Sequence, residues 1–254
     1  MRFVIEIVWQ AIGQISAGDV GLVETTLRTL RFALLATVLA LLVGVPLALW
    51  LSAASTRPRR VGLVLANAGL GLPPVVLGVY LALTLTPGSL LGRLGWLYTP
   101  RGVVAAQALL ALPIVVALSS AALRGLPAEL QEQARAFGAS RWQRAALALR
   151  EARVGIAAAV IATLGSAIAE VGAVVIVGGN IRDQTSTLTS TVLLELAAGA
   201  PDRAVACVLV LLLLLAALAL LLTLVQRGAG VARLRPRLRG RARVLASGVP
   251  GARA

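Results

Sequence analysis

Five long apolar stretches dominate the 254-residue sequence, and four of them contain no charged residue at all. About 20 apolar residues are enough for a helix to cross the hydrocarbon core of a bilayer, and each stretch exceeds that length. Only 13% of the residues are charged and the mean hydropathy is +0.91, which excludes an ordinary soluble domain. The sequence therefore predicts an all-α polytopic membrane protein. Its expected crossings are Phe32–Thr56, Val61–Gly92, Gly102–Leu123, Val154–Ile181 and Ala204–Gln226.

The net charge of +14 comes entirely from arginine, because no lysine occurs among the 24 basic residues. On a soluble chain this excess would indicate nucleic acid, but here most arginines lie in loops and a tail beside apolar stretches. Topology and contact with anionic lipid explain that placement better, so we expect no nucleic-acid partner. With five crossings, seventeen arginines fall on one side of the membrane and seven on the other. The arginine-rich side is expected to be cytoplasmic, which puts the N-terminus outside and the C-terminus inside.

The two ends of the chain differ from the apolar middle. Residues 1–26 place apolar side chains apart from Glu6, Gln10 and Gln14, as expected of an amphipathic helix at the membrane surface. Residues 27–226 form the expected membrane domain. Residues 227–254 are rich in Arg, Gly and Pro, so we expect a disordered basic tail on the cytoplasmic side.

The residue inventory argues against catalysis by this chain. There is no His and no Lys, the ten acids are scattered, and the one cysteine, Cys207, lies in an apolar run. An intramembrane enzyme such as a lipid phosphatase would need clustered acids or bases, so we expect neither a catalytic residue nor a metal site. The phosphate-binding pattern GxxxxGK[ST] is also absent from the sequence. A passive channel or a structural membrane subunit remains an alternative to transport.

The loop at residues 124–153 reads as two short amphipathic helices on the expected cytoplasmic side. Pro127 suits a helix start, and Leu130, Ala134 and Phe137 form one apolar stripe. Gly138 suits the end of that helix and Ser140 the beginning of the next. The second helix repeats the stripe with Trp142, Ala145, Ala146 and Leu149. Two destinations are open for these apolar faces, which are a groove on a partner protein and the membrane surface.

The same loop resembles the "EAA" loop of ATP-binding-cassette (ABC) importer permeases. The matching residues are Glu132, Ala134, Gly138, Ala139 and Ser140, whereas Gln133 departs from the usual Ala and Arg150-Glu151 stand where many such permeases have Leu-Pro. Further segments resemble permeases of tungstate importers. They are GLGLPPVVLGVYLAL (69–83), WLYTP (96–100), ALPIVVAL (111–118), LREAR (149–153) and IAEVGAVVIVGGNI (168–181).

The resemblance implies a MetI-like permease bundle with a defined set of partners. It implies a second copy of the permease, a cytoplasmic ABC ATPase dimer and an extracytoplasmic substrate-binding protein, in the inner membrane of a prokaryotic cell. The loop would form the coupling helix that docks in a groove of the ATPase. Ala134 would allow close approach, and Gly138 would form the turn. ATP and Mg²⁺ would bind on the partner ATPase, so no cofactor is expected on this chain. Tungstate, molybdate or another anion would cross by alternating access.

A tungstate dianion needs a path that binds it weakly enough to release it, and neutral hydrogen-bond donors meet that need. Gly178, Gly179 and Asn180 end the fourth crossing, and a hydroxyl-rich run with Thr185, Thr187 and Thr189 follows them. We expect this segment to dip back and to line the outer mouth of the pathway. The alternative is an ordinary polar loop in which Ser and Thr serve as turn residues.

Glu170 is the only acid within an expected crossing, which makes it a candidate functional residue. Because its charge has the wrong sign for binding an anion, we expect a structural role in the helix bundle, or else a repulsive position beside the path. The same crossing carries small residues at three- and four-residue spacing, including Ala162, Ser166 and Ala169. Such spacing permits close helix contact in lipid, either between two permeases or within one.

Overall fold

The structure, a computed structural model, describes residues 2–54 and 56–246, with side-chain surroundings described for 5–54 and 56–227. Apart from connecting loops, this part of the chain is helical throughout. The elements are α1 (Arg2–Ser16), α2 (Val20–Ala53), α3 (Thr56–Leu70), α4 (Pro74–Leu85), the 3₁₀ turn η1 (Gly92–Leu94), α5 (Pro100–Arg124), α6 (Ala128–Ala136), α7 (Arg141–Glu151), α8 (Arg153–Ala169), α9 (Gly172–Gly178), α10 (Leu188–Ala197) and α11 (Pro201–Ala246).

Three helices are long and apolar enough to cross a membrane unaided, namely α2, α5 and α11 as far as Arg227. Helix α2 begins twelve residues before the expected start at Phe32. Asp19 explains the difference, because its Oδ1 accepts the Leu22 N–H at 2.9 Å and caps the helix there. The charged residues in the first turns of α2 indicate where its membrane-embedded apolar part begins, but the helix itself begins earlier.

The other two expected crossings are each broken into two helices. Helices α3 and α4 meet at a bend of 100°, at the two prolines Pro73 and Pro74. Helix α8, with only 17 residues, adjoins α7 at a bend of 68° and α9 after a short break at Glu170. Because α7 carries three arginines and α9 is entirely apolar, α8 with α9 is the better candidate for the fourth crossing.

Helix α5 is the centre of the bundle, and α2, α3, α8 and α9 all pack against it. Along α2, Phe32 packs with Val103 of α5 and Val174 of α9, while Ala40 packs with Ala111 and Val115 one level further along α5. Small side chains let the backbones approach closely. Gly44 of α2, for example, leaves no room for a Cβ beside Val115.

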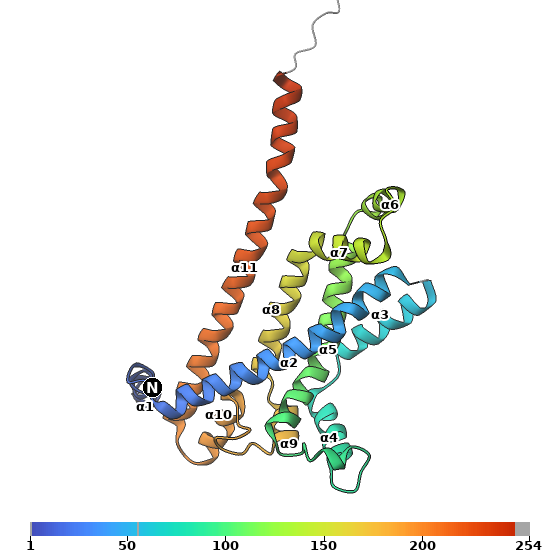
Figure 1. The fold of residues 1–254 in the computed structure, drawn as a ribbon. Helices are drawn as coiled ribbons and strands as arrows, with labels where there is room; N and C mark the ends of the chain where they lie inside the picture. The colour runs from blue at the N-terminus through green and yellow to red at the C-terminus, as the bar shows by residue number, and fades with distance from the viewer. Residues whose placement is uncertain (1, 55, 247–254) are drawn as a thin grey trace, which may run out of the picture.

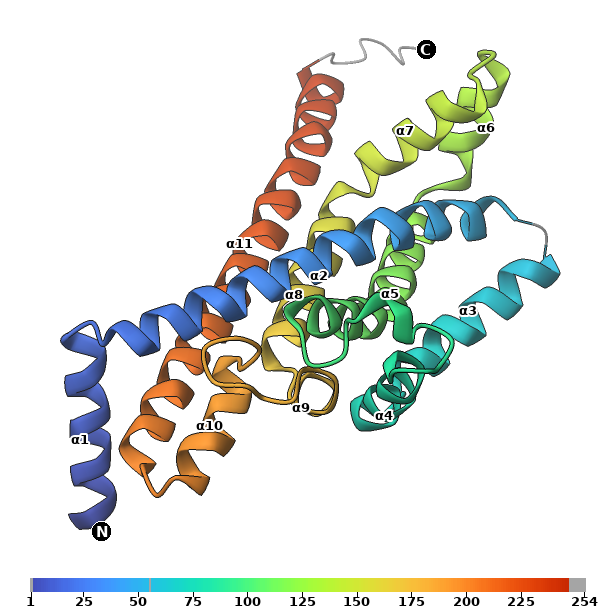
Figure 2. The ribbon, with the colours of Figure 1, turned by 60° about the horizontal axis from the view of Figure 1, so that its bottom comes forward.

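The connections gather at two opposite ends of the molecule (Figure 1). One end holds the α2–α3 connection, α6, α7 and the far part of α11, and the other holds α1, α9, α10 and the 86–99 loop. Figure 2 shows α3 leading away from the end of α2, and α10 next to the start of α11. The arginine-rich segments that were predicted to share one side of the membrane therefore lie at the same end of the fold.

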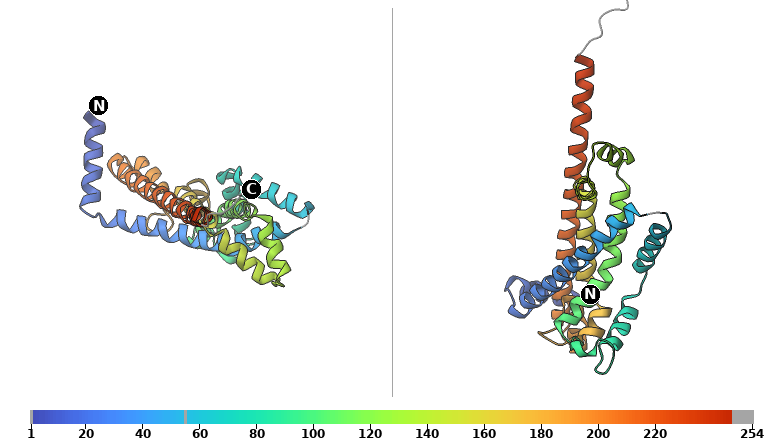
Figure 3. Two further views of the ribbon diagram at one scale, coloured as in Figure 1. Left: turned by 90° about the horizontal axis from the view of Figure 1, so that it is seen from above. Right: turned by 45° about the vertical axis from the view of Figure 1, so that its right-hand side comes forward.

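Helix α1 turns sharply away from α2 and lies beside the start of α11 (Figures 2 and 3). Gln14 Nε2 donates to Asp202 Oδ2 at 2.7 Å, which fixes the end of α1 to α11. Ile5 and Trp9 remain exposed, as a surface-lying helix requires. The position of α1 in a membrane stays a prediction.

Helix α11 is the last element that the structure describes. Helix α11 continues without a break to Ala246 and projects beyond the rest of the molecule (Figure 3); the tail residues 247–254 lie outside the described range. The disorder expected for residues 227–254 stays a prediction.

Candidate functional site

The loop between α5 and α8 folds as the expected pair of short helices, α6 and α7. Pro127 is the N-cap of α6, one position earlier than a first helical residue, and α6 ends at Ala136. Gly138 follows with φ +77°, a conformation that glycine adopts without strain, and the Ala139 N–H bonds the Ala134 carbonyl at 2.9 Å. Ser140 then begins α7 with a reciprocal capping box to Gln143.

The turn carries two large aromatic side chains with no neighbours to cover them. Phe137 is 91% exposed just before Gly138, and Trp142 is 86% exposed just after it. Glu132 is also exposed, whereas Ala134 and Ala139 are half-buried. An isolated chain gains nothing by placing these aromatics in solvent, so they mark a contact surface. We call Phe137, Gly138 and Trp142 the aromatic turn.

The aromatic turn is connected to the bundle through α7. Helix α6 has no buried residue, but Ala148 of α7 is buried against Ala48, Leu123 and Ala152. Ala152 serves both as the end of α7 and as the N-cap of α8. A displacement of the turn would therefore be transmitted through α7 directly to α8.

At the opposite end of α8, Glu170 caps a helix inside the membrane-spanning region. Its Oε1 accepts the Ala173 N–H at 2.9 Å, in the first turn of α9. Its own carbonyl accepts the Thr189 hydroxyl at 2.8 Å, and Gln107 Nε2 of α5 donates to the Ala167 carbonyl at 3.0 Å. Backbone groups freed by a helix break must find partners where water is absent. These three polar side chains supply them, so the structural role expected for Glu170 fits its surroundings.

The break between α3 and α4 lies next to the break between α8 and α9. A Cβ on Gly172 would come within 3.3 Å of the Val75 backbone nitrogen, and one on Gly78 within 2.9 Å of Ala173 Cα. The first turns of α4 and α9 thus pack directly against each other. Two expected crossings are interrupted at one place in the bundle, and α4 and α9 are the short helices that follow the two breaks (Figure 1).

The hydroxyl run after α9 points into the protein and not out of it. Thr185, Thr187 and Thr189 are all buried. The Thr185 hydroxyl donates to the Gly178 carbonyl at 2.7 Å and accepts the Ile181 N–H at 2.8 Å. Thr187 caps α10, a ten-residue helix that was not predicted from the sequence. In this chain the hydroxyls hold the segment's shape, and their part in a pathway stays a prediction.

Gly178, Gly179 and Asn180 form the tight turn after α9. Gly179 has φ +71° and Asn180 has φ +48°. A Cβ on Gly179 would come within 2.7 Å of the Tyr98 ring, so only glycine fits here. Asn180 is half-buried and its Nδ2 donates to the Ser190 carbonyl at 3.1 Å, which ties the turn to α10.

Several residues that hold this end together were not singled out from the sequence. Thr29 of α2 accepts the Leu188 N–H at 2.8 Å, and Arg28 Nε donates to the Ser186 carbonyl at 2.8 Å. Thr25, Arg28 and Thr29 recur at helical spacing on one face of α2, which was an available signal. Gln107, a lone amide in an uncharged crossing, was another.

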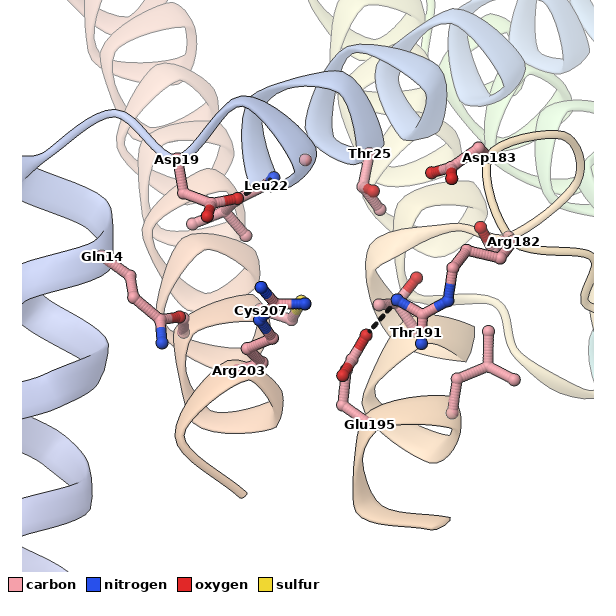
Figure 4. Close-up of a pocket in the computed structure, with 14 residues that line it drawn as sticks. Gln14, Asp19, Leu22, Thr25, Arg182, Asp183, Thr191, Glu195, Arg203 and Cys207 are labelled. Carbon is pink, nitrogen blue, oxygen red and sulfur yellow. Dashed lines mark hydrogen bonds and ion pairs between the residues drawn. The ribbon is translucent and has the colours of Figure 1, made fainter. Parts of the chain in front are cut away.

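A small cavity of about 70 Å³ lies between α2, α10 and the start of α11 (Figure 4). Arg182 and Glu195 face each other there as an ion pair at 2.6 Å, and Asp19, Asp183 and Arg203 also line it. Because three acids and two arginines line the cavity, it offers no net attraction for an anion. We interpret it as part of the contact that ties α10 to α2 and α11.

The fold defines a membrane-spanning component, and the aromatic turn gives it an exposed apolar surface. Comparison with known proteins makes this specific, because residues 28–231 match the family described as binding-protein-dependent transport system inner membrane component. The chain belongs to this family, whose members are permease subunits of ABC transporters.

Curated relatives carry related names. A probable anion ABC transporter permease of Haloferax volcanii is 36% identical over 73% of this chain and 82% of its own. The tungstate uptake permease TupB of Peptoclostridium acidaminophilum is 31% identical over 67% and 75%. The molybdenum transport permease ModB of Azotobacter vinelandii is 36% identical over 63% and 74%.

Solved structures confirm the predicted MetI-like fold. The MetNI methionine ABC transporter in inward-facing conformations superimposes with a TM-score of 0.62 at 20% identity, covering 80% of this chain and 95% of the other. A second structure, of an amino acid ABC transporter, gives a TM-score of 0.61 at 17% identity, covering 84% and 96%.

Proposed function

We propose that this chain is the membrane subunit of an ATP-driven oxyanion importer, with tungstate as its substrate and molybdate as the alternative. The names of three relatives support an anion of this class. The chain would work as a pair of permeases in a prokaryotic inner membrane. An ABC ATPase dimer on the cytoplasmic side would bind ATP and Mg²⁺, and an external binding protein would deliver the anion.

The observation that carries the proposal is the exposed aromatic turn. Phe137 and Trp142 are exposed aromatic side chains on either side of Gly138, between α6 and α7, and these helices lie at the end of the molecule with the arginine-rich connections. A groove on the ATPase would receive them, with Ala134 and Ala139 allowing close approach and with Glu132 and Ser140 at the edge of the contact. Helix-in-groove contacts of this kind place a few apolar anchors from one helical face into a partner.

In this mechanism, closure of the ATPase dimer moves the turn, and α7 passes the displacement through Ala152 to α8. The bundle then rocks between states that open to opposite sides. We place the anion path along the broken crossings, where α4 and α9 begin next to each other. The segment from Gly178 to Thr189 would form the outer rim, with its backbone held rigid by the buried hydroxyls. Neutral hydrogen-bond donors on that rim would bind the anion weakly enough to release it.

The test is uptake in cells that express the chain with a candidate ATPase and a binding protein. Labelled tungstate should accumulate only when all three proteins are present, and unlabelled molybdate and sulfate should be compared as competitors. Accumulation without the ATPase would indicate a passive channel. Preferential competition by molybdate would move the assignment to that anion.

A further inference from the structure

A large apolar groove opens on the side of the bundle, and neither the aromatic turn nor the first turns of α4 and α9 line it. It encloses about 470 Å³ between the last turns of α2 and the first turns of α3, with α5 as its floor. Three residues of α5 form the floor, namely Leu112, Pro113 and Val116. The walls are Leu47, Trp50 and Leu51 of α2 and Pro58, Val61, Gly62, Leu65 and Ala66 of α3.

The groove is kept open by the way α3 touches its neighbours. Gly62 lies against the Leu51 side chain, and Gly69 lies against Pro113, where a Cβ would come within 2.7 Å of the ring. Between and beside these close contacts the helices diverge. Trp50 is 56% exposed and Leu65 is 66% exposed, so the walls are apolar surfaces that nothing in the described chain covers.

The length of the groove matches one leaflet of a bilayer. It follows α3 from Pro58 to Ala66, which at the helical rise corresponds to about 12 Å. One leaflet contributes about half of the roughly 30 Å hydrocarbon core. An acyl chain that entered beside Pro58 would therefore lie along the whole groove without crossing the bilayer midplane.

Positive charge is concentrated where the groove reaches the end of the molecule. Arg57, Arg59 and Arg60 surround Pro58 in the first turns of α3, which contain no acid. Neither ion pair recorded in the described part of the chain involves them. Basic residues are unfavourable at a helix N-terminus, because the helix dipole is already positive there. A bound anion would stabilise both the arginines and the N-terminal end of the helix dipole. Arg57 and Arg60 are exposed and available to one.

The geometry points to a binding site for an anionic phospholipid, which we propose as a further function of this chain. The acyl chain occupies the groove, and the phosphate of the headgroup lies against Arg57, Arg59 and Arg60. Ala48, near the end of α2, packs against Ala148 of α7. The headgroup, next to the α2–α3 connection, therefore lies at the same end of the bundle as the coupling loop. The site does not depend on which anion the transporter carries.

A second copy of the permease is the competing occupant of the groove. An apolar helix from another copy would account for the exposed walls, but it would leave three arginines at the entrance without a counter-charge. A lipid with a net negative headgroup matches both the apolar groove and the three arginines at its entrance. A zwitterionic lipid satisfies only the apolar half.

The test uses Trp50 as a reporter, since it forms a wall of the groove. In a full-length variant with Trp9, Trp96 and Trp142 replaced by Phe, Trp50 is the only tryptophan. This protein is reconstituted into phosphatidylcholine vesicles that contain a small fraction of brominated phosphatidylglycerol or of brominated phosphatidylcholine. Each arginine near an anionic lipid strengthens the association by about fivefold. Trp50 should therefore be quenched at least about tenfold more efficiently by the brominated phosphatidylglycerol.

The matched variants change three arginines each, at opposite ends of the bundle. R57Q/R59Q/R60Q should reduce the preference to within about twofold, while R31Q/R93Q/R101Q should leave it intact. Equal quenching of the parent by both lipids would overturn the proposal, because it would indicate ordinary lipid contact. So would protection of Trp50 from both lipids, which would indicate that protein fills the groove.

If the single-tryptophan variant does not accumulate, native mass spectrometry of the wild-type chain decides the question. If the wild-type chain retains phosphatidylglycerol and R57Q/R59Q/R60Q loses it, the result supports the site. If the wild-type chain retains no anionic lipid, the proposal is overturned.

Discussion

Glu170 and Ala173 are joined by a 2.9 Å hydrogen bond from the Ala173 N–H to the Glu170 carboxylate, at a break between two helices of one membrane crossing. The only acid in the predicted crossings is thus bonded to the backbone. An acceptor at that position stabilises the first turn of α9, which has no turn before it to supply a carbonyl.

Replacing Glu170 by Ala should destabilise the protein by about 1–3 kcal/mol, because the Ala173 N–H loses its acceptor in a dry environment. Replacing it by Gln keeps an acceptor oxygen and should cost less. Thermal unfolding of the purified protein in detergent measures the difference. Equal losses for the two variants would mean that the charge matters and the hydrogen bond does not.

Thr185 separates a structural role of the hydroxyl run from a role in contacting the anion. Thr185→Val preserves shape but leaves the Gly178 carbonyl and the Ile181 N–H without their partner, at a cost of about 1–3 kcal/mol. Thr185→Ser keeps the hydroxyl and should remain close to wild type. Melting temperature and the KM for uptake should be measured for both. A raised KM at an unchanged melting temperature would place this hydroxyl in the pathway.

The apolar pattern was enough to predict the membrane class, the three long apolar helices α2, α5 and α11, and the short helix pair around Gly138. It could not predict which residues the bundle buries. Thr185 and Glu170 look polar and functional in sequence, yet both bond backbone groups. Glu170 does so at the α8–α9 break, where Gln107 and Thr189 also bond the backbone, and Thr185 does so in the turn after α9. Helix α10 was missed because its hydroxyls resemble a loop until they are seen as caps.

Gly138 is predicted to be replaceable only by residues that tolerate a left-handed backbone. Gly138→Ala meets no steric obstacle, but at φ +77° it costs about 1–2 kcal/mol and should lower ATP-driven uptake. Gly138→Asn should retain more activity, because Asn enters this conformation more readily. Gly125→Ala is the matched control in the same loop, since Gly125 has a right-handed helical conformation at φ −72°. If Gly138→Ala transported as well as Gly125→Ala, the turn conformation would not matter for coupling.

The predicted orientation can be tested by cysteine labelling of intact cells. In a Cys207→Ala background, Glu132→Cys should react with a membrane-impermeant maleimide only after permeabilisation. Leu90→Cys lies in the exposed loop at the opposite end of the molecule and should react in intact cells. Reversed labelling would place the aromatic turn outside the cell, where no ATPase could reach it.

The most direct test of coupling is co-purification of the ATPase with aromatic-turn variants. F137A/W142A removes two side chains that contact nothing in the described bundle, so folding and membrane insertion should be unchanged. The account predicts that this variant loses at least about tenfold in ATPase binding, because each anchor of such a contact contributes more than about 1 kcal/mol. Wild-type levels of bound ATPase and of ATP-driven uptake in F137A/W142A would contradict it.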